Sequence, residues 1–600
     1  MINEIKLPDL SGGINTQDPE YGINDNQSPD MLNLWFRGKA LAKRPGQSLV
    51  LELPDTHRIA HFNGVKIIHA GDKLYSWDDE LEELQDGIED AAGVFIPFGG
   101  KLYYIDGVEI WEIDSEFTVS TVDPYTPVVL ETALPDLSDS ADKESFNLIG
   151  AGFTVHYNGD GESTAYTLPQ QALDDTEIEV VVNAEDLEEG TNFTVNRTTG
   201  TIDFAAGTSP HGAPTNGTNN VWITAYKTVE GNKDRIVKCT IGMAYGGETA
   251  GVFGGTRVFV MGNPDYPINY WMSDLGRTGY GMTYFPDTQE EQLDQNSQPI
   301  TAAAKMGENL VMFKSRSIFV IGYAFDTENV YYPVRNVHDA IGCESPKSVQ
   351  LIDNKLVFAN TNGIFILSGL DISSESLVKP LSANINKILA DEDLTDACST
   401  DFEQYYWLCA NGKVFLWDYG KTPYYNYSDY EKAQKRLAWY MFDNIDAKEF
   451  YFDSGLYHVS DSGIVKFTAQ KNDFGQAISS YFKSKAFDLG KPHEPKTFVN
   501  VYTSFAADQN IKCRVSFGSE KEDEYRYVDY DIKSFGWDGF SWAVFTWKAI
   551  KLTKTYRFRL NMRKKAYLQF FISGGDLDRG VGVSSMQIEY YFVGKTKERE

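Results

Sequence analysis

Residues 307–322, GENLVMFKSRSIFVIG, and residues 353–369, DNKLVFANTNGIFILSG, share one pattern that decides the fold. Each begins at a Gly, Asn or Asp turn and continues as an apolar strand, a second turn and a second apolar strand. Similar hairpins begin near residues 63, 99, 254, 402 and 448, and the last five of the seven are spaced by roughly 45 to 55 residues. Self-similar β-units at a period of ~40–50 residues are typical of propeller blades.

A single blade cannot bury both of its faces, whereas neighbouring blades around an axis can. The alternation in KLYYI (101–105) and GLYHV (455–459) would place one set of side chains against the next blade. We therefore predict a mainly β chain built on an irregular β-propeller of six or seven blades. The alternative is a β-sandwich in which similar hairpins recur by coincidence.

Two stretches depart from the repeat. Between residues ~116 and ~235 the strands are longer, turns occur at NGDG and TTG, and carboxylates are frequent, which predicts a small inserted β-domain. From about residue 476 long strands alternate cleanly, which predicts a terminal β-sandwich-like domain. The expected parts are an N-terminal arm (1–50), first blades (51–115), the insert (116–235), remaining blades (236–475) and a C-terminal β-domain (476–600).

Composition limits the classes of function. The chain has 600 residues and a formal charge of −32, so it should bind DNA phosphates poorly and could let a duplex pass without sticking. Five cysteines without a CxxC pair favour a reducing compartment over a disulfide framework. No apolar run approaches the ~20 residues of a membrane helix, and the start MINEIKLPDL does not have the form of a secretory signal.

The sequence contains no recognisable motif for catalysis or cofactor binding. GKT at 420–422 has no upstream Gly for a phosphate loop, and NGDGES at 158–163 does not have the ligand spacing of a calcium loop. The repeated Ser-x-Asp box of sialidases does not occur, and no acid and base can be nominated. We therefore predict no catalytic, cofactor-binding or metal-binding residues.

A basic and aromatic run lies in the C-terminal domain. Its members are Lys551, Lys554, Tyr556, Arg557, Phe558, Arg559, Arg563, Lys564, Lys565 and Tyr567. Such a run could contact single-stranded nucleic acid or an acidic neighbouring subunit. It is also what an ordinary strand with one solvent-facing side would show.

Several segments in order resemble one family. GGIN (12–15) with SPDMLNLWFRGKALAKRPG (28–46) is similar to the N-terminal signature of tail-nozzle proteins of short-tailed phages, also called tail tubular protein B or tail hub proteins. Ala40 before Leu41 is a departure of one residue from that signature. Residues 255–276 with YFPDT (284–288), residues 297–322 and residues 341–369 look like successive blades of the same family.

The resemblance implies a virion tail protein that is assembled in the bacterial cytoplasm. Six copies would form a ring below the portal and the adaptor, or head-to-tail connector, and extend the channel through which the genome leaves. Tail fibres or spikes are further expected partners. The expected function is that of a structural conduit without enzymatic activity. The alternative is a propeller protein that binds or depolymerises a host glycan, which sugar release or sugar binding would reveal.

The resemblance also gives the opening segment a role. We expect it to reach away from the propeller and to anchor in an apolar groove of a neighbouring subunit or of the adaptor ring. The expected contacts are Met31, Leu32, Leu34, Trp35 and Phe36, with Lys43, Arg44 and Pro45 setting the exit turn. The alternative is that the segment packs on its own chain.

Overall fold

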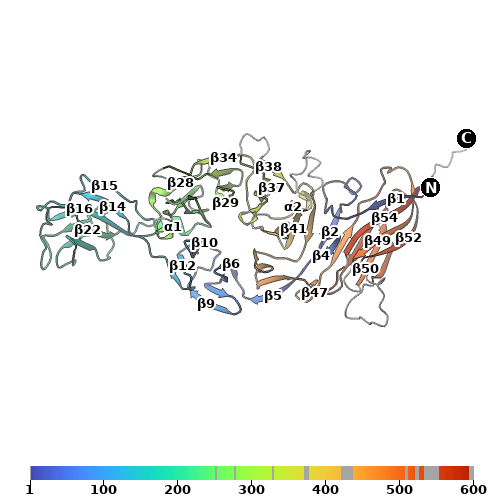
Figure 1. Ribbon diagram of the computed structural model, residues 1–600, viewed down its shortest axis with the longest axis horizontal. Helices are drawn as coiled ribbons and strands as arrows, with labels where there is room; N and C mark the ends of the chain where they lie inside the picture. The colour runs from blue at the N-terminus through green and yellow to red at the C-terminus, as the bar shows by residue number, and fades with distance from the viewer. Residues whose placement is uncertain are drawn as a thin grey trace. The chain divides into compact units, whose positions relative to one another are not determined.

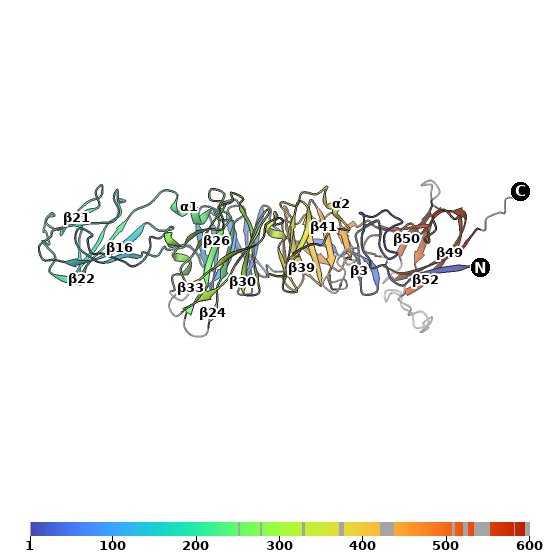
Figure 2. The same ribbon diagram turned by 90° about the horizontal axis from the view of Figure 1, so that it is seen from above.

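The structure is a computed structural model that describes residues 2–249, 253–275, 279–326, 330–370, 377–420, 437–506, 511–519, 526–532, 553–580 and 582–593. The chain forms two compact units. Unit 1 comprises Met1–Thr56 and Val337–Glu600, and unit 2 comprises His57–Asn336. Strands dominate both units (Figures 1 and 2). Among the described residues, no helix is long and apolar enough to cross a membrane.

Four antiparallel sheets of unit 2 have the four-stranded meander of a propeller blade. Their strands are β6 (Thr56–Phe62), β7 (Val65–Ala70), β8 (Lys73–Trp77) and β9 (Leu81–Asp86); β10 (Val94–Phe98), β11 (Lys101–Ile105), β12 (Ile110–Ile113) and β13 (Val119–Thr121); β23 (Ile241–Tyr245), β26 (Arg257–Met261), β27 (Asn269–Met272) and β28 (Glu290–Gln292); β29 (Ile300–Met306), β30 (Asn309–Lys314), β31 (Ile318–Ile321) and β34 (Val334–His338).

Two short ribbons and one helix accompany these sheets. They are β24 (Glu248–Thr249) with β25 (Phe253–Gly254), β32 (Ala324–Phe325) with β33 (Val330–Tyr331), and α1 (Asn232–Val237).

Unit 1 contributes three more sheets of the same kind. Their strands are β35 (Gln350–Ile352), β36 (Lys355–Asn360), β37 (Gly363–Leu367) and β38 (Val378–Pro380); β39 (Cys398–Phe402), β40 (Tyr405–Ala410), β41 (Lys413–Asp418) and β42 (Trp439–Phe442); β43 (Glu449–Phe452), β44 (Leu456–Ser460), β45 (Gly463–Thr468) and β5 (Gly46–Glu52), with β46 (Asn472–Asp473) and β47 (Gln476–Ala477) beyond β5. Helix α2 (Asn386–Leu389) follows β38. The described residues thus form seven blade-type sheets, and the predicted propeller fold is confirmed.

Strand β5 joins the beginning of the chain to the last blade. It pairs antiparallel with β45, from Gly46 opposite Thr468 to Glu52 opposite Gly463. The expected boundary of the N-terminal arm at residue 50 therefore falls inside a propeller strand. A strand that pairs with a segment more than 400 residues away leaves no local signal in the sequence.

Two-residue turns connect the strands of several blades. Asn63 and Gly64 have φ of 48° and 89°, and Asn411 and Gly412 have φ of 50° and 75°. Positive φ at both central residues is the mark of a type I′ hairpin, which Asn-Gly adopts readily because its twist matches that of the flanking strands. The Asn-Gly pairs at these turns therefore set the register of the hairpins directly.

The insert lies in unit 2 and has two sheets (Figure 2). One has the order β15-β14-β16-β22-β18-β19 and the other the order β17-β21-β20. Their strands are β14 (Val128–Ala133), β15 (Ala141–Asp142), β16 (Gly152–Gly159), β17 (Ala165–Thr167), β18 (Glu179–Val182), β19 (Glu185–Leu187), β20 (Thr194–Asn196), β21 (Thr201–Asp203) and β22 (Gly217–Tyr226). The strands of the insert lie within the expected bounds of 116–235 but do not fill them. At one end β13 still belongs to a blade, and at the other α1 packs in a blade core.

Unit 1 ends in a two-sheet β-sandwich that both termini of the chain build. One sheet has the order β3-β4-β54-β49-β52 with β1 on β54, and the other has the order β2-β48-β53-β50-β51. Figure 1 shows the blue strands β1, β2 and β4 beside the red ones. The strands are β1 (Asn3–Leu7), β2 (Asp30–Leu32), β3 (Leu34–Arg37), β4 (Ala40–Lys43), β48 (Ser480–Lys483), β49 (Lys496–Ala506), β50 (Ile511–Gly518), β51 (Arg526–Ile532), β52 (Thr553–Lys565), β53 (Gln569–Gly574) and β54 (Gly582–Phe592).

Candidate functional site

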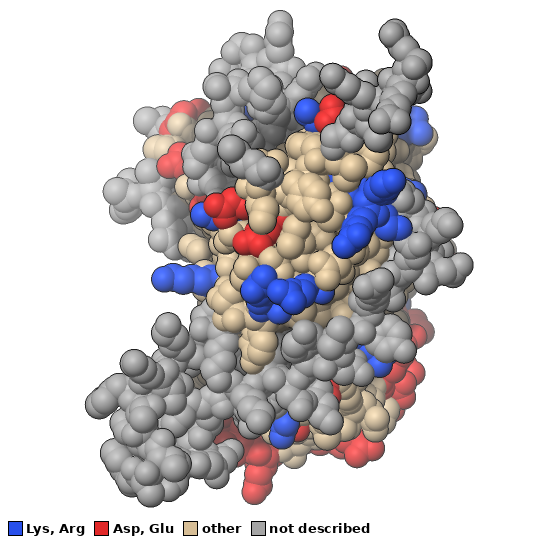
Figure 3. All heavy atoms as spheres, turned by 90° about the vertical axis from the view of Figure 1, so that its right-hand side faces the viewer, with Lys and Arg blue, Asp and Glu red and all other residues tan. Residues whose placement is uncertain are grey.

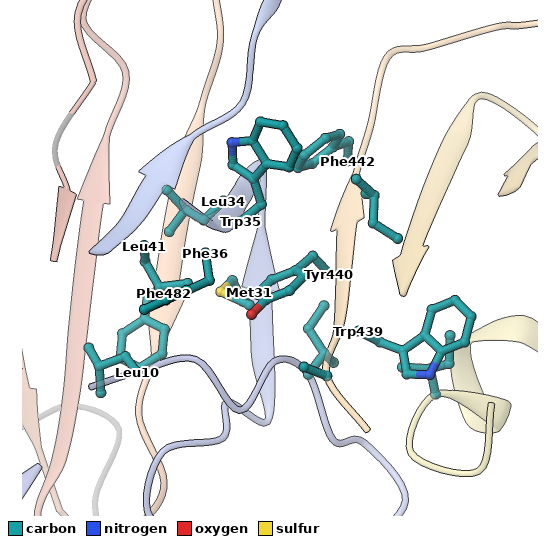
Figure 4. Close-up of a cluster of buried hydrophobic side chains, with 14 of the residues drawn as sticks. Leu10, Met31, Leu34, Trp35, Phe36, Leu41, Trp439, Tyr440, Phe442 and Phe482 are labelled. Carbon is teal, nitrogen blue, oxygen red and sulfur yellow. The ribbon is translucent and has the colours of Figure 1, made fainter. Parts of the chain in front are cut away.

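The apolar island of the opening segment lies in the hydrophobic core of unit 1. Met31 on β2 pairs with Phe482 on β48, and the side chains of Leu34, Trp35 and Phe36 are all buried. Figure 4 shows Trp35 beside Phe442 and Met31 beside Tyr440 of the blade strand β42, whereas Leu34 and Phe36 lie toward Leu41 and Phe482. One continuous core therefore links the sandwich to the sixth blade-type sheet.

Trp35 is the centre of this contact. Its ring centroid lies 5.1 Å from that of Tyr405 and 5.9 Å from those of both Trp407 and Phe442, the last two in edge-on geometry. Edge-to-face aromatic pairs contribute about 0.5–1.5 kcal/mol each beyond the area that they bury. These three aromatic neighbours, two of them edge-on, hold β3 firmly against the blade.

The expectation that the opening segment reaches away from the propeller is therefore wrong. Strands β1, β2 and β4 pair with strands that begin more than 400 residues later, and β3 pairs with β4, so the apolar groove belongs to the same chain. Of the eight predicted contact residues, only Leu32 and Pro45 keep part of their surface exposed. A role of these eight residues in contacts between subunits stays a prediction.

Arg44 anchors a buried polar network next to this core. The side chain is 0% exposed and forms an ion pair with Asp473, with Nη1 donating to Oδ1 at 2.9 Å. Nε donates to Asn33 Oδ1 at 2.9 Å, and Nη2 donates to the Asp443 carbonyl at 3.0 Å. Planar guanidinium groups suit such bidentate pairs, and a buried charge needs them.

Lys43 and Gly46, the first and last residues of the Lys-Arg-Pro-Gly motif, are also held closely by their neighbours. Lys43 Nζ donates to the carbonyls of Asp576 and Arg579 at 3.0 and 3.1 Å. Burial, and then the charge of Arg44, lower the pKa of Lys43 to about 8. A Cβ on Gly46 would lie 1.9 Å from the Asn472 carbonyl oxygen, so only glycine fits there.

The GGIN turn fastens the same segment to the blades. Gly13 has φ of 71°, and a Cβ there would lie 2.5 Å from the backbone of Trp439. The Ile14 amide donates to the Trp439 carbonyl at 2.7 Å, and the Thr16 amide donates to the Asn384 carbonyl at 2.9 Å. The backbone of the GGIN turn and of the residue after it thus lies close to the backbone of the blades.

A pocket of about 490 Å³ opens beside the Arg44 network. Its lining is formed by Asn411, Gly412, Asn444, Ile445, Asp446, His458, Ser460, Asp461, Ser462, Val465 and Phe474. Burial lowers the pKa of His458 to about 4, and its Nε2 lies 2.8 Å from Gln47 Oε1. The histidine is therefore neutral at pH 7 and supports the network. Among the described residues, no group of three or more His, Cys, Asp or Glu could hold a metal ion.

The basic run of the C-terminal domain lies on β52. Arg557, Arg559 and Arg563 are exposed, whereas the intervening Phe558 and Leu560 are buried. This is the alternation of an ordinary strand with one solvent-facing side. Lys551 and the side chain of Lys554 lie outside the described residues.

We call the exposed Arg557, Arg559, Arg563 and Lys564 of β52 the basic face. Arg557 Nε donates to Asn500 Oδ1 of β49 at 3.0 Å, and its guanidinium carbon lies 5.9 Å from the centre of the Tyr502 ring. Figure 3, which faces the sandwich, shows groups of Lys and Arg side chains beside an uncharged area that Asp and Glu side chains also border. On a chain of net charge −32, the basic face is a local group of four cations.

Comparisons with known proteins give no family for the chain. No family model matches it, and no curated protein matches it. Solved structures with some similarity include the AfRom2 CNH domain (6% identity, 70% of this chain and 97% of that one, TM-score 0.32) and the Neurospora crassa Pan2 WD40 domain (7%, 72% and 97%, TM-score 0.29).

A third is an exo-β-1,3-galactanase from Phanerochaete chrysosporium (6% identity, 83% of this chain and 95% of that one, TM-score 0.21). All three TM-scores are below 0.5. The likeness therefore carries no argument about activity, and the fold assignment rests on the sheet topology.

Proposed function

We propose that the chain is a structural subunit of the tail of a short-tailed phage. In this proposal, six copies form a nozzle ring that extends the DNA-ejection channel below the portal and the adaptor ring. The ring is assembled in the bacterial cytoplasm and gives attachment points to tail fibres or spikes. The proposal assigns no catalysis to the chain.

The observation that carries the proposal is the place of the opening segment. Its two parts that resemble the nozzle family, GGIN and the stretch that ends in KRPG, contain residues that tie two blade sheets, those of β42 and β46, to the sandwich in unit 1. The segment and the strand that follows it supply strands to three different sheets. A family-like signature with a purely architectural position suits a scaffold that must stay rigid while a genome passes.

The charge of the chain favours the same function. A net charge of −32 per copy repels a duplex, and at ~10 Å screening the repulsion acts only close to the wall. Such a wall would let DNA slide without retaining it. The basic face is then available for contact with an acidic surface of a neighbouring subunit, because opposite charges steer and orient association.

The decisive experiment is electron microscopy of the purified full chain, alone and mixed with an adaptor ring. We expect closed rings around a channel, as head-to-tail contacts that close would give. A chain that stays monomeric under all conditions and is absent from purified virion tails would overturn the proposal.

A second arm of this experiment addresses the alternative function. The same preparation is incubated with host-surface polysaccharide, and reducing ends are counted. We expect no release of sugar above a heat-treated control. Sustained release by a monomer would favour the depolymerising alternative over the nozzle.

A further inference from the structure

Trp222 is exposed in the middle of the larger sheet of the insert. It lies on β22, which has β16 on one side and β18 on the other. The inward side chains Val221 and Ile223 of this strand are fully buried, whereas Trp222 is 48% exposed. The core of the insert is therefore complete without the indole, and tryptophan is usually a largely buried residue.

The indole is held in one orientation. Its Nε1 donates to the Asn219 carbonyl at 2.7 Å, and its ring stacks on His156 of β16 with centroids 4.6 Å apart and planes 19° apart. The two residues face each other directly across the paired strands. Burial, followed by the charge of Lys143, lowers the pKa of His156, so the imidazole is neutral at pH 7. A flat surface that is already ordered loses little side-chain entropy when a ligand binds.

Polar groups surround this stack. The hydroxyls of Thr154 and Thr224 lie 2.8 Å apart, on the next pair of these two strands that is on the same face of the sheet. Toward β14, Lys143 donates to Glu131 at 2.8 Å. Toward β18, the Tyr226 hydroxyl donates to Glu179 at 3.2 Å. One flat aromatic surface is thus framed by hydroxyl and carboxylate groups.

We propose that the insert binds a neutral pyranoside oligosaccharide on the stack of Trp222 and His156. A pyranose ring has an apolar C–H face, which suits the negative π-face of an indole, and a rim of hydroxyls, which suits the surrounding polar groups. The proposal does not rest on the nozzle function, because it concerns the insert alone.

Two other ligand classes fit less well. A protein interface of ordinary size buries about 800 Å² on each partner around an apolar centre, and Trp222 is the one large exposed hydrophobic residue within the described span 128–226. Single-stranded nucleic acid also stacks on aromatics but needs a positive groove. The insert has eight carboxylates between residues 174 and 189, which repel phosphates and acidic sugars alike.

The test is isothermal titration of the full chain with maltohexaose, cellohexaose, mannohexaose and chitohexaose, with hexagalacturonate as the acidic comparison. We expect at least one neutral hexasaccharide to bind with Kd below about 1 mM and hexagalacturonate to bind more weakly. Trp222→Ala should weaken binding by about tenfold or more, as loss of a central aromatic contact does, and Trp222→Phe should retain part of the affinity.

Phe452→Ala is the matched control, because Phe452 is 61% exposed on a blade of unit 1. Phe452→Ala should bind the hexasaccharide with the same affinity as the unchanged chain. Trp222→Ala should have the same melting temperature as the unchanged chain. The proposal is overturned if no neutral hexasaccharide binds at about 5 mM, or if Trp222→Ala binds as tightly as the unchanged chain. Trp222-dependent binding of a virion protein in the absence of sugar binding would overturn it as well.

Discussion

Arg44 shows how one buried charge can define a junction between distant segments. Its guanidinium is fully buried and contacts Asn33, Asp443 and Asp473, which come from three separate stretches of unit 1. Each partner is itself positioned, since Asn33 also donates to Asp443 Oδ1 at 2.6 Å. Buried charges that are this well paired are sensitive to the loss of either partner.

We expect Arg44→Met to lower the free energy of unfolding by about 3–5 kcal/mol, because it leaves the buried Asp473 carboxylate without its counter-charge. Urea denaturation of the full chain measures this change. Adding Asp473→Leu should recover part of the loss. Arg37→Met is the control, because the Arg37–Glu403 pair is partly exposed, at 47% and 36%, and should cost no more than about 1 kcal/mol. Equal losses in both arginine variants would contradict the assignment.

His458 gives a prediction for acid stability. Its pKa is about 4 in the folded chain, against 6.5 for a free side chain, because burial disfavours the charged imidazole. The unfolded state therefore binds more protons between these values, and stability falls as pH drops below about 6.5. Between pH 7 and pH 5 this residue should account for a loss of roughly 2 kcal/mol.

His458→Gln should remove that part of the pH dependence. The readout is the difference in the free energy of unfolding between pH 7 and pH 5, measured for the variant and for the unchanged chain. A lower stability of the variant at both pH values would be acceptable, since Gln47 loses a partner at 2.8 Å. An unchanged difference between the two pH values would contradict the prediction.

At the scale of elements, the opening strands act as parts of the sandwich and of the last blade. Strand β4 pairs with β54, β2 pairs with β48, and β5 pairs with β45. Strand β5 therefore connects the opening segment to the last blade. Its pairing also leaves fewer strand edges exposed.

We expect deletion of residues 2–45 to destabilise unit 1 as a whole, since it removes four strands and the Trp35 contact. Losing a buried tryptophan alone costs about 3–5 kcal/mol. Soluble yield and cooperativity of thermal unfolding measure the effect. Deletion of residues 2–8, which removes only β1 at the margin of the sheet, should be much milder. A folded, cooperative chain after the larger deletion would show that the segment is a dispensable arm.

At the scale of the whole chain, the net charge of −32 and the small basic face predict weak contact with DNA. A mobility-shift assay with a duplex at about 150 mM salt should show no complex in the range of ordinary non-specific binding, ~10⁻⁴–10⁻⁶ M. Any residual binding should disappear in Arg559→Glu with Arg563→Glu and should persist in Lys73→Glu, which reverses a cation on a blade. Tight binding with a steep salt dependence would contradict the conduit.

The sequence by itself determined the repeating hairpins and the class of the fold. Asn63–Gly64, Asn411–Gly412 and the apolar pairs around them act through neighbouring residues, so the blade pattern can be read locally. The pattern of β52 can also be read locally, because the alternation of arginine with buried apolar residues indicates one solvent-facing side.

Only the tertiary structure decided where the opening segment lies. The apolar side chains Met31, Leu34 and Trp35 predicted a buried contact, but their partners on β42 and β48 are remote in sequence. The same limit hid the stack of Trp222 on His156, whose two residues are neighbours only after β22 pairs with β16. Local turn chemistry is written in adjacent residues, whereas pairing across hundreds of residues depends on the core that the whole chain encloses.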